Sequence, residues 1–93
     1  MRAQHHDAAN LDAAAKLKSY LERQLLVEFG SEVDESSDLF RLGLIDSYAY
    51  IEVLRFIESE FQVSFTEEEM LLEVEVSLAG LAALAERKMA QAA

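Results

Sequence analysis

The chain has 93 residues and a formal net charge of −10, so we expect a single domain with a small core. A chain of this size has little room for the dry, walled pocket that catalysis needs, and we therefore expect no enzymatic activity. The absence of cysteine excludes a disulfide framework and a thiolate metal site.

The negative charge is concentrated in the middle of the chain. Residues 32–75 contain 13 acidic residues and only two arginines, Arg41 and Arg55, whereas residues 1–31 are balanced. A negative field repels the phosphates of nucleic acid. It attracts proteins with basic surfaces and speeds their encounter at low salt. We therefore expect no nucleic acid. From composition alone, the charge indicates either protein partners with basic surfaces or acidic residues that merely keep a small protein soluble.

The ends of the chain give no sign of a membrane segment. No apolar run approaches the roughly 20 residues of a membrane-spanning helix, and residues 1–10 are polar, without the apolar centre of a signal peptide. We expect a cytoplasmic monomer with a disordered lead over residues 1–10, a single domain over residues 11–90, and a frayed end over residues 91–93.

Two features suggest a metal ion, and neither is sufficient. His5 and His6 lie in the polar lead without further ligands nearby in sequence. A calcium loop starting at Asp34 would need a glycine at its sixth position and a glutamate at its last, where the chain has Leu39 and Ile45. We therefore expect no resident metal.

The first predicted helix is followed by a long loop. Asn10 or Asp12 is suited to cap the helix, which is expected to run to about Phe29, with Gly30 as the left-handed residue that ends it. A loop over residues 31–46 would be unusually long for a compact domain. Five apolar side chains are expected to pin it to the core: Leu39, Phe40, Leu42, Leu44 and Ile45.

The second predicted helix runs from Ser47 to about Phe61, with Asp46 as its N-cap. At 100° per residue, its core stripe contains Tyr50, Val53, Leu54, Ile57 and Phe61. Tyr48 and Ile51 lie beside Ser47 and outside that stripe, which suggests a small docking patch. Phe56 also lies outside the stripe, on the other side.

Two further helices complete the fold. Thr66 and Glu69 fit a capping box for a short third helix through about Leu72. An extended connector is expected to place Val74 and Val76 against the core, and Ser77 is expected to cap a fourth helix that ends near Met89. These elements predict an all-α four-helix bundle of three longer helices and one short helix, with the long loop between the first two.

Ser47 is the residue whose chemistry stands out. As a nucleophile it would need a neighbouring base, but the only histidines lie in the lead and no Gly-x-Ser-x-Gly motif surrounds it. As a substrate it is well placed, because a phosphate ester at a helix N-terminus is favoured by free N–H groups and the helix dipole. Asp46 could bind a metal ion while another enzyme carries out the transfer.

Asp38-Leu39-Phe40, the run from Leu42 to Tyr48, and the helix pattern that follows resemble the acyl carrier protein family over about residues 12–89. The resemblance implies that Ser47 carries 4′-phosphopantetheine, transferred from coenzyme A by a magnesium-dependent phosphopantetheinyl transferase, with cargo held as a thioester. It also implies that the second helix docks onto basic patches of loading ligases and acyl-transferring enzymes. The implied docking residues are Asp46, Tyr48, Ile51, Glu52, Arg55 and Glu58.

Several residues depart from the pattern of fatty-acid carriers. Tyr48 replaces the usual leucine, Ala49 replaces a frequent acid, and Arg55 adds a positive charge. These differences favour an acyl or aminoacyl carrier of a specialised pathway over one of housekeeping fatty-acid synthesis. The alternative function is a non-carrier helical module that binds a basic protein through its acidic surface.

Overall fold

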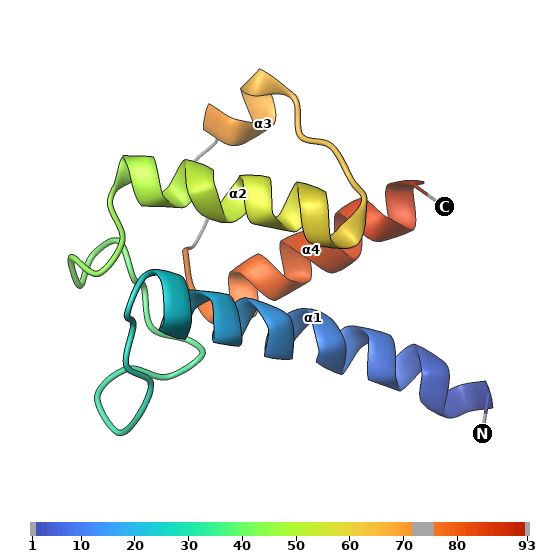
Figure 1. The fold of residues 1–93 in the computed structure, drawn as a ribbon, viewed down its shortest axis with the longest axis horizontal. Coiled ribbons are helices and arrows are strands. Elements are labelled where there is room, and N and C mark those ends of the chain that lie inside the picture. The colour runs from blue at the N-terminus through green and yellow to red at the C-terminus, as the bar shows by residue number, and fades with distance from the viewer. Residues whose placement is uncertain (1, 72–75, 93) are drawn as a thin grey trace.

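The computed structural model describes residues 2–71 and 76–92, and all regular secondary structure in these ranges is helical. The helices are α1 (Arg2–Gln24), α2 (Ser47–Phe61), α3 (Glu67–Leu71) and α4 (Leu78–Ala92). Figure 1 shows α1, α2 and α4 as the body of the fold, with the short α3 lying outside them. The predicted all-α fold with a long loop after the first helix is confirmed.

The core is formed where α1, α2 and α4 meet, and buried residues of the connecting segments complete it: Val27, Leu39, Ile45, Val63, Phe65 and Val76. Its members are almost entirely apolar, which provides the main driving force for folding such a small domain. The apolar side chains with the lowest exposure are Ala13, Leu17, Leu21, Leu39, Ile45, Val53, Leu54, Ile57, Leu81 and Ala85.

Helix α1 ends earlier than predicted. It stops at Gln24 rather than near Phe29, because Leu26 adopts a left-handed φ of 59° and the Val27 amide donates to the Leu21 carbonyl at 3.0 Å. This reversal buries Val27. Gly30 was wrongly predicted to end the helix: its φ is not in the left-handed region, and its amide donates to the Val33 carbonyl at 2.8 Å.

Helix α1 begins earlier, and helix α4 ends later, than the sequence suggested. α1 already begins at Arg2, and alanines in its first turns favour the helical backbone. Figure 1 shows these turns extending past the other helices. α4 continues to Ala92, beyond the expected end near Met89. The domain boundaries near residues 11 and 90 stay predictions.

Helix α2 has the predicted bounds. Four of the five residues predicted for its core stripe are buried. Tyr50, Val53, Leu54 and Ile57 are buried, while Phe61 is half-buried. The stripe is wider than predicted, because Phe56 stacks on Tyr20 of α1 with 4.2 Å between ring centroids. The helix ends at Gln62, which is left-handed, and the Val63 amide donates to the Glu58 carbonyl at 3.2 Å.

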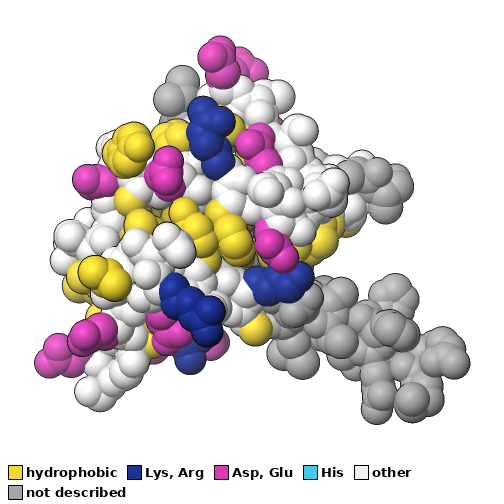
Figure 2. Space-filling view, in the orientation of Figure 1, with side chains coloured by type: hydrophobic (Ala, Val, Ile, Leu, Met, Phe, Trp, Pro, Cys, Tyr) yellow, Lys and Arg dark blue, Asp and Glu magenta, His cyan; other side chains and the backbone are white. Residues whose placement is uncertain are grey.

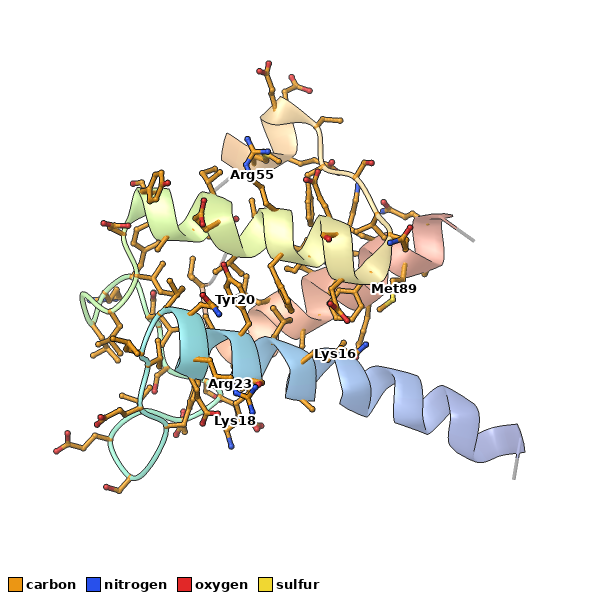
Figure 3. All side chains as sticks on the ribbon, viewed as in Figure 1. Lys16, Lys18, Tyr20, Arg23, Arg55 and Met89 are labelled. Atoms are coloured by element: carbon orange, nitrogen blue, oxygen red, sulfur yellow. The ribbon has the colours of Figure 1, made fainter. Side chains whose placement is uncertain are left out.

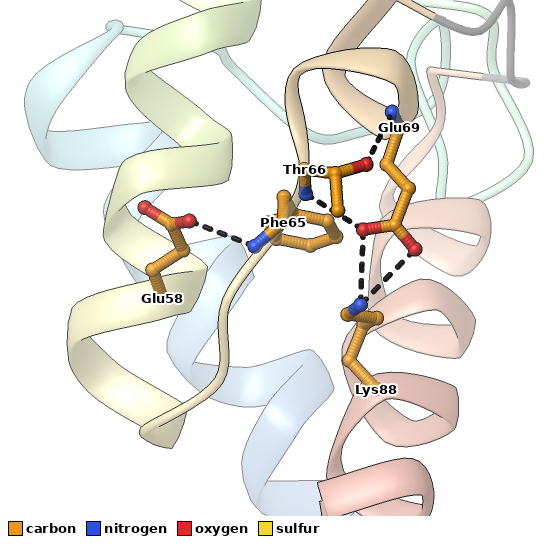
Figure 4. Close-up of polar contacts among 5 residues, drawn as sticks. All are labelled: Glu58, Phe65, Thr66, Glu69 and Lys88. Atoms are coloured by element: carbon orange, nitrogen blue, oxygen red, sulfur yellow. Dashed lines mark hydrogen bonds and ion pairs between the residues drawn. The ribbon is translucent and has the colours of Figure 1, made fainter.

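Figure 4 shows how polar contacts hold α3 in place. The predicted capping box is present: the Glu69 amide donates to the Thr66 hydroxyl at 3.1 Å, and the Glu69 carboxylate accepts from the Thr66 amide at 2.8 Å. The same carboxylate accepts from Lys88 of α4 at 3.1 Å. α3 is thereby tied to α4 although it is only one turn long.

The connection from α3 to α4 is partly described. Leu72 and Val74 lie outside the described residues, while Val76 is buried as predicted. Ser77 caps α4, because its hydroxyl accepts from the Gly80 amide at 3.0 Å.

The Asp46 cap gives a first prediction. Its carboxylate accepts from the Ala49 amide at 2.8 Å, so Asp46→Ala should lower the free energy of unfolding by about 1 kcal/mol. Asp46→Asn keeps an accepting oxygen and should recover most of this loss. Urea denaturation of the three proteins measures the difference, and an alanine variant as stable as the asparagine variant would contradict the capping role.

The Glu69 carboxylate gives a second prediction, on pH dependence. The Thr66 amide, followed by the Lys88 ammonium, holds the pKa of Glu69 below its usual value of 4.5. A lowered pKa contributes stability that is present above 4.5 and is lost as the pH falls through the lowered value. The native chain should therefore have a higher free energy of unfolding than Glu69→Gln at pH 7. This difference should shrink as the pH falls below 4.5 and through the lowered pKa of Glu69.

Side-chain NMR titration tests the cause directly. Lys88→Met removes the ammonium while keeping an apolar stem, and the pKa of Glu69 should rise, though not fully to 4.5 because the Thr66 amide remains. Lys18→Met, on α1, is the matched control and should leave the Glu69 pKa unchanged. An unchanged Glu69 pKa in Lys88→Met would show that this ion pair does not act on the carboxylate.

Candidate functional site

A compact turn in the loop determines where α2 begins. The Asp38 carboxylate accepts from the amides of Phe40 and Arg41 at 3.1 and 3.2 Å, and the Asp38 carbonyl accepts from the Leu42 amide at 3.1 Å. Gly43 closes the turn with a φ of 76°, a conformation that other residues adopt only with strain. The short polar side chain and the glycine therefore shape the approach to Ser47.

Leu39 anchors this turn in the core. Its side chain is fully buried, its amide donates to the Val76 carbonyl at 2.8 Å, and its carbonyl accepts from Leu44 and Ile45. The Val76 bond joins the turn to the chain just before α4. Ile45 is buried beside it, so the two residues hold the loop end immediately before Ser47.

The expectation that all five apolar residues of the loop pin it to the core is wrong for three of them. Leu39 and Ile45 are buried, but Phe40, Leu42 and Leu44 are 40%, 52% and 40% exposed. A tight turn cannot direct every side chain inward, and the hydrogen bonds of Asp38 fix which ones face out. The spacing of apolar residues in the loop therefore does not reveal that Phe40, Leu42 and Leu44, just before Ser47 in the chain, are exposed.

Ser47 is the first residue of α2 and its side chain is exposed. The Asp46 carboxylate accepts a hydrogen bond from the Ala49 amide, and the Asp46 carbonyl accepts one from the Tyr50 amide at 2.9 Å. Within the described residues, the amides of Ser47 and Tyr48 have no hydrogen-bond partner. These free donors add to the positive end of the helix dipole at the serine.

The predicted docking residues do not all face solvent equally. Tyr48 is 75% exposed, Asp46, Glu52 and Arg55 are also exposed, and Ile51 is half-buried. Figure 3 shows Arg55 extending from the side of α2 that faces away from α1. Asp46, Tyr48, Glu52 and Arg55 are therefore the predicted docking residues that are exposed to a partner.

Glu58 differs from the other predicted docking residues because it has a structural contact. Its carboxylate accepts from the Phe65 amide at 2.8 Å, and its side chain is half-buried (Figure 4). This bond ties the C-terminal part of α2 to the segment that enters α3. A partner could still reach Glu58, but the carboxylate already satisfies a backbone donor.

The basic residues of α1 lie on another part of the molecule. Lys16 pairs with Glu60 at 2.9 Å, and Lys18 lies over the Phe29 ring. Figure 2 shows lysine and arginine side chains beside the apolar side chains exposed between α1 and α2, and Figure 3 shows Lys16, Lys18 and Arg23 extending from α1. Lys16 is therefore engaged near the C-terminal end of α2, whereas Ser47 is the first residue of that helix.

The described part of the chain contains neither a cluster of metal ligands nor a membrane-spanning helix. No group of three or more histidine, aspartate or glutamate side chains in it could hold a metal ion; the side chains of His5 and His6 lie outside the described set. None of its helices has both the length and the apolar content needed to cross a bilayer.

The residues at the α2 start fit a covalent phosphopantetheine arm. The Ser47 hydroxyl is accessible for esterification, and a phosphodiester carries a negative charge that the free amides at the helix start favour. The chain has no cysteine of its own, so a thiol for thioester chemistry must be supplied by such an arm.

Comparison with known proteins agrees with this geometry. The family model for the phosphopantetheine attachment site matches residues 15–85, a range that includes α2, α3 and most of α1 and α4. Neither the curated proteins nor the solved structures provide a match. Since the match covers most of the chain, the protein belongs to the acyl carrier protein family, whose members are non-catalytic carriers with a covalent 4′-phosphopantetheine.

Proposed function

We propose that Ser47 is the attachment serine and that the protein presents an acyl or aminoacyl group to partner enzymes of a specialised pathway. The observation that carries the proposal is the exposed Ser47 hydroxyl at the first residue of α2, inside the matched range. Asp46 caps the helix start, and the Asp38–Gly43 turn fixes the course of the loop that leads to it.

In the loading step, the Ser47 oxygen is the acceptor. Its bond to phosphorus forms as the pyrophosphate bond of coenzyme A breaks, adenosine bisphosphate leaves, and the transferase takes the hydroxyl proton. The arm supplies the thiol on which cargo is held as a thioester. This chain contributes an accessible hydroxyl, the two free amides of Ser47 and Tyr48, and a carboxylate at Asp46 beside them.

The surface around Ser47 supports docking by proteins with basic rims and an apolar centre. Asp46 and Glu52 provide exposed negative charge, and Tyr48 and Leu42 provide exposed apolar area. Such a surface steers a basic partner at long range and then buries apolar area on contact. Besides the phosphopantetheinyl transferase, the proposed partners are a loading ligase and acyl-transferring enzymes.

The specialised pathway is supported by the exposed residues that depart from fatty-acid carriers. Tyr48 presents an exposed aromatic ring directly after Ser47, and Arg55 places an exposed positive charge on the side of α2 that faces away from α1. A positive charge repels the basic patches that fatty-acid enzymes present to carriers, so Arg55 discriminates against them.

Incubation with coenzyme A, magnesium and a phosphopantetheinyl transferase should raise the intact mass by one phosphopantetheine, because the Ser47 hydroxyl is exposed. Ser47→Ala should take up none. Ser59→Ala, which removes another exposed α2 hydroxyl, is the control and should load fully. Mass uptake by Ser47→Ala would disprove the assignment, and no uptake by the native chain would favour the non-carrier module.

Charge reversal at Arg55 tests the discrimination. With holo protein at low ionic strength, Arg55→Glu should raise the turnover of fatty-acid synthesis enzymes on this carrier by on the order of threefold to tenfold. The gain should fall as salt screens the charge. Arg87→Glu, an exposed site on α4 with the same charge change, should have little effect. Equal turnover of the native and Arg55→Glu proteins would remove the role given to Arg55.

A further inference from the structure

Tyr50 has a buried hydroxyl without a hydrogen-bond partner. The residue is 7% exposed, and its hydroxyl oxygen is buried and unpaired within the described structure. The other two tyrosines differ: the Tyr20 hydroxyl donates to the Glu52 carbonyl at 3.4 Å, and Tyr48 is 75% exposed. Leaving a buried hydroxyl unsatisfied costs about 1–3 kcal/mol, so such groups normally have a partner.

The position of Tyr50 links this hydroxyl to the attachment site. Tyr50 follows Ser47 by about one helical turn, and its ring lies against Phe40 with 6.0 Å between ring centroids. Phe40 is 40% exposed, so it is the loop side chain that connects the buried ring to the surface. A group tethered at Ser47 is held near Phe40 at a high effective concentration. It can reach the buried Tyr50 ring when the Phe40 side chain moves aside.

The surroundings of Tyr50 limit the chemistry of such a group. Tyr50 belongs to a cluster of buried apolar side chains that includes Leu39, Val53 and Leu54, which suits a hydrocarbon chain. Burial raises the pKa of Tyr50, so the phenol stays protonated at neutral pH and can donate. A buried ammonium of an aminoacyl group would find no charge there to offset its desolvation.

We propose that the Tyr50 hydroxyl donates a hydrogen bond to an oxygen on the cargo, so that the core beside Ser47 shelters a neutral oxo- or hydroxyacyl chain better than a plain alkyl chain or an aminoacyl group. This inference rests on the proposed attachment at Ser47. It restricts the proposed class of cargo from acyl groups in general to acyl groups with an oxo or hydroxyl substituent on the chain.

The test uses matched cargoes on the whole protein. The transferase loads 3-oxohexanoyl, hexanoyl or alanyl coenzyme A onto the native chain, Tyr50→Phe and Tyr20→Phe, and mass spectrometry follows thioester hydrolysis. For the 3-oxohexanoyl cargo, Tyr50→Phe should speed hydrolysis by about threefold to tenfold, the worth of one hydrogen bond. For the hexanoyl and alanyl cargoes it should change the rate little. Tyr20→Phe removes the hydroxyl that donates to the Glu52 carbonyl and should hydrolyse all three cargoes at the rate of the native chain.

The outcomes separate this inference from the proposed function. Equal acceleration of all three cargoes by Tyr50→Phe, or none, would overturn it, because the arm itself or a water molecule would then satisfy the hydroxyl. Unloaded Tyr50→Phe should be at least as stable as the native chain in thermal denaturation; a clear loss would show that the hydroxyl has a partner without cargo. Failure of every variant to load would refute the attachment at Ser47.

Discussion

The buried backbone and side chain of Leu39 are the constraint on which the site depends. Through its amide this residue reaches the Val76 carbonyl before α4, and through its carbonyl it holds Leu44 and Ile45 before α2. A loop from residue 25 to 46 would otherwise leave the start of α2 poorly fixed, because a long irregular segment has many conformations to lose on folding. With Leu39 and Ile45 in the core, Ser47 follows at a defined place on the surface.

This arrangement places the proposed attachment serine next to exposed apolar side chains that we propose for partner recognition. The same turn that buries Leu39 directs Phe40 and Leu42 outward, next to a helix start whose free amides favour an anionic ester. Asp46 and Glu52 provide exposed negative charge at the start of α2 and along it, while Lys16 of α1 pairs with Glu60 and Lys18 lies over Phe29. A basic partner is therefore attracted toward Ser47 rather than toward α1.

The parts of the fold that depend on local patterns could be predicted from the sequence. Asp46 before an apolar stripe was sufficient to predict the bounds of α2, and Thr66 with Glu69 was sufficient for the α3 cap. The end of α1 could not be predicted from spacing, because the apolar stripe of the sequence continues to Phe29. In the structure, the left-handed Leu26 ends the helix earlier and Val27 is buried in the core. The contact of Glu58 with the Phe65 amide and the unpaired Tyr50 hydroxyl depend on how separate segments meet, which spacing along the chain does not encode.

The central claim is that Ser47 carries the arm, and tryptic peptide mapping tests it most directly. Cleavage after Arg41 and Arg55 releases residues 42–55, in which Ser47 is the only serine and threonine is absent. After co-expression with a phosphopantetheinyl transferase, fragmentation of this peptide by tandem mass spectrometry should place one phosphopantetheine on Ser47. The same group on any other peptide, or an unmodified 42–55 peptide after demonstrated transferase activity on a known carrier, would contradict the account.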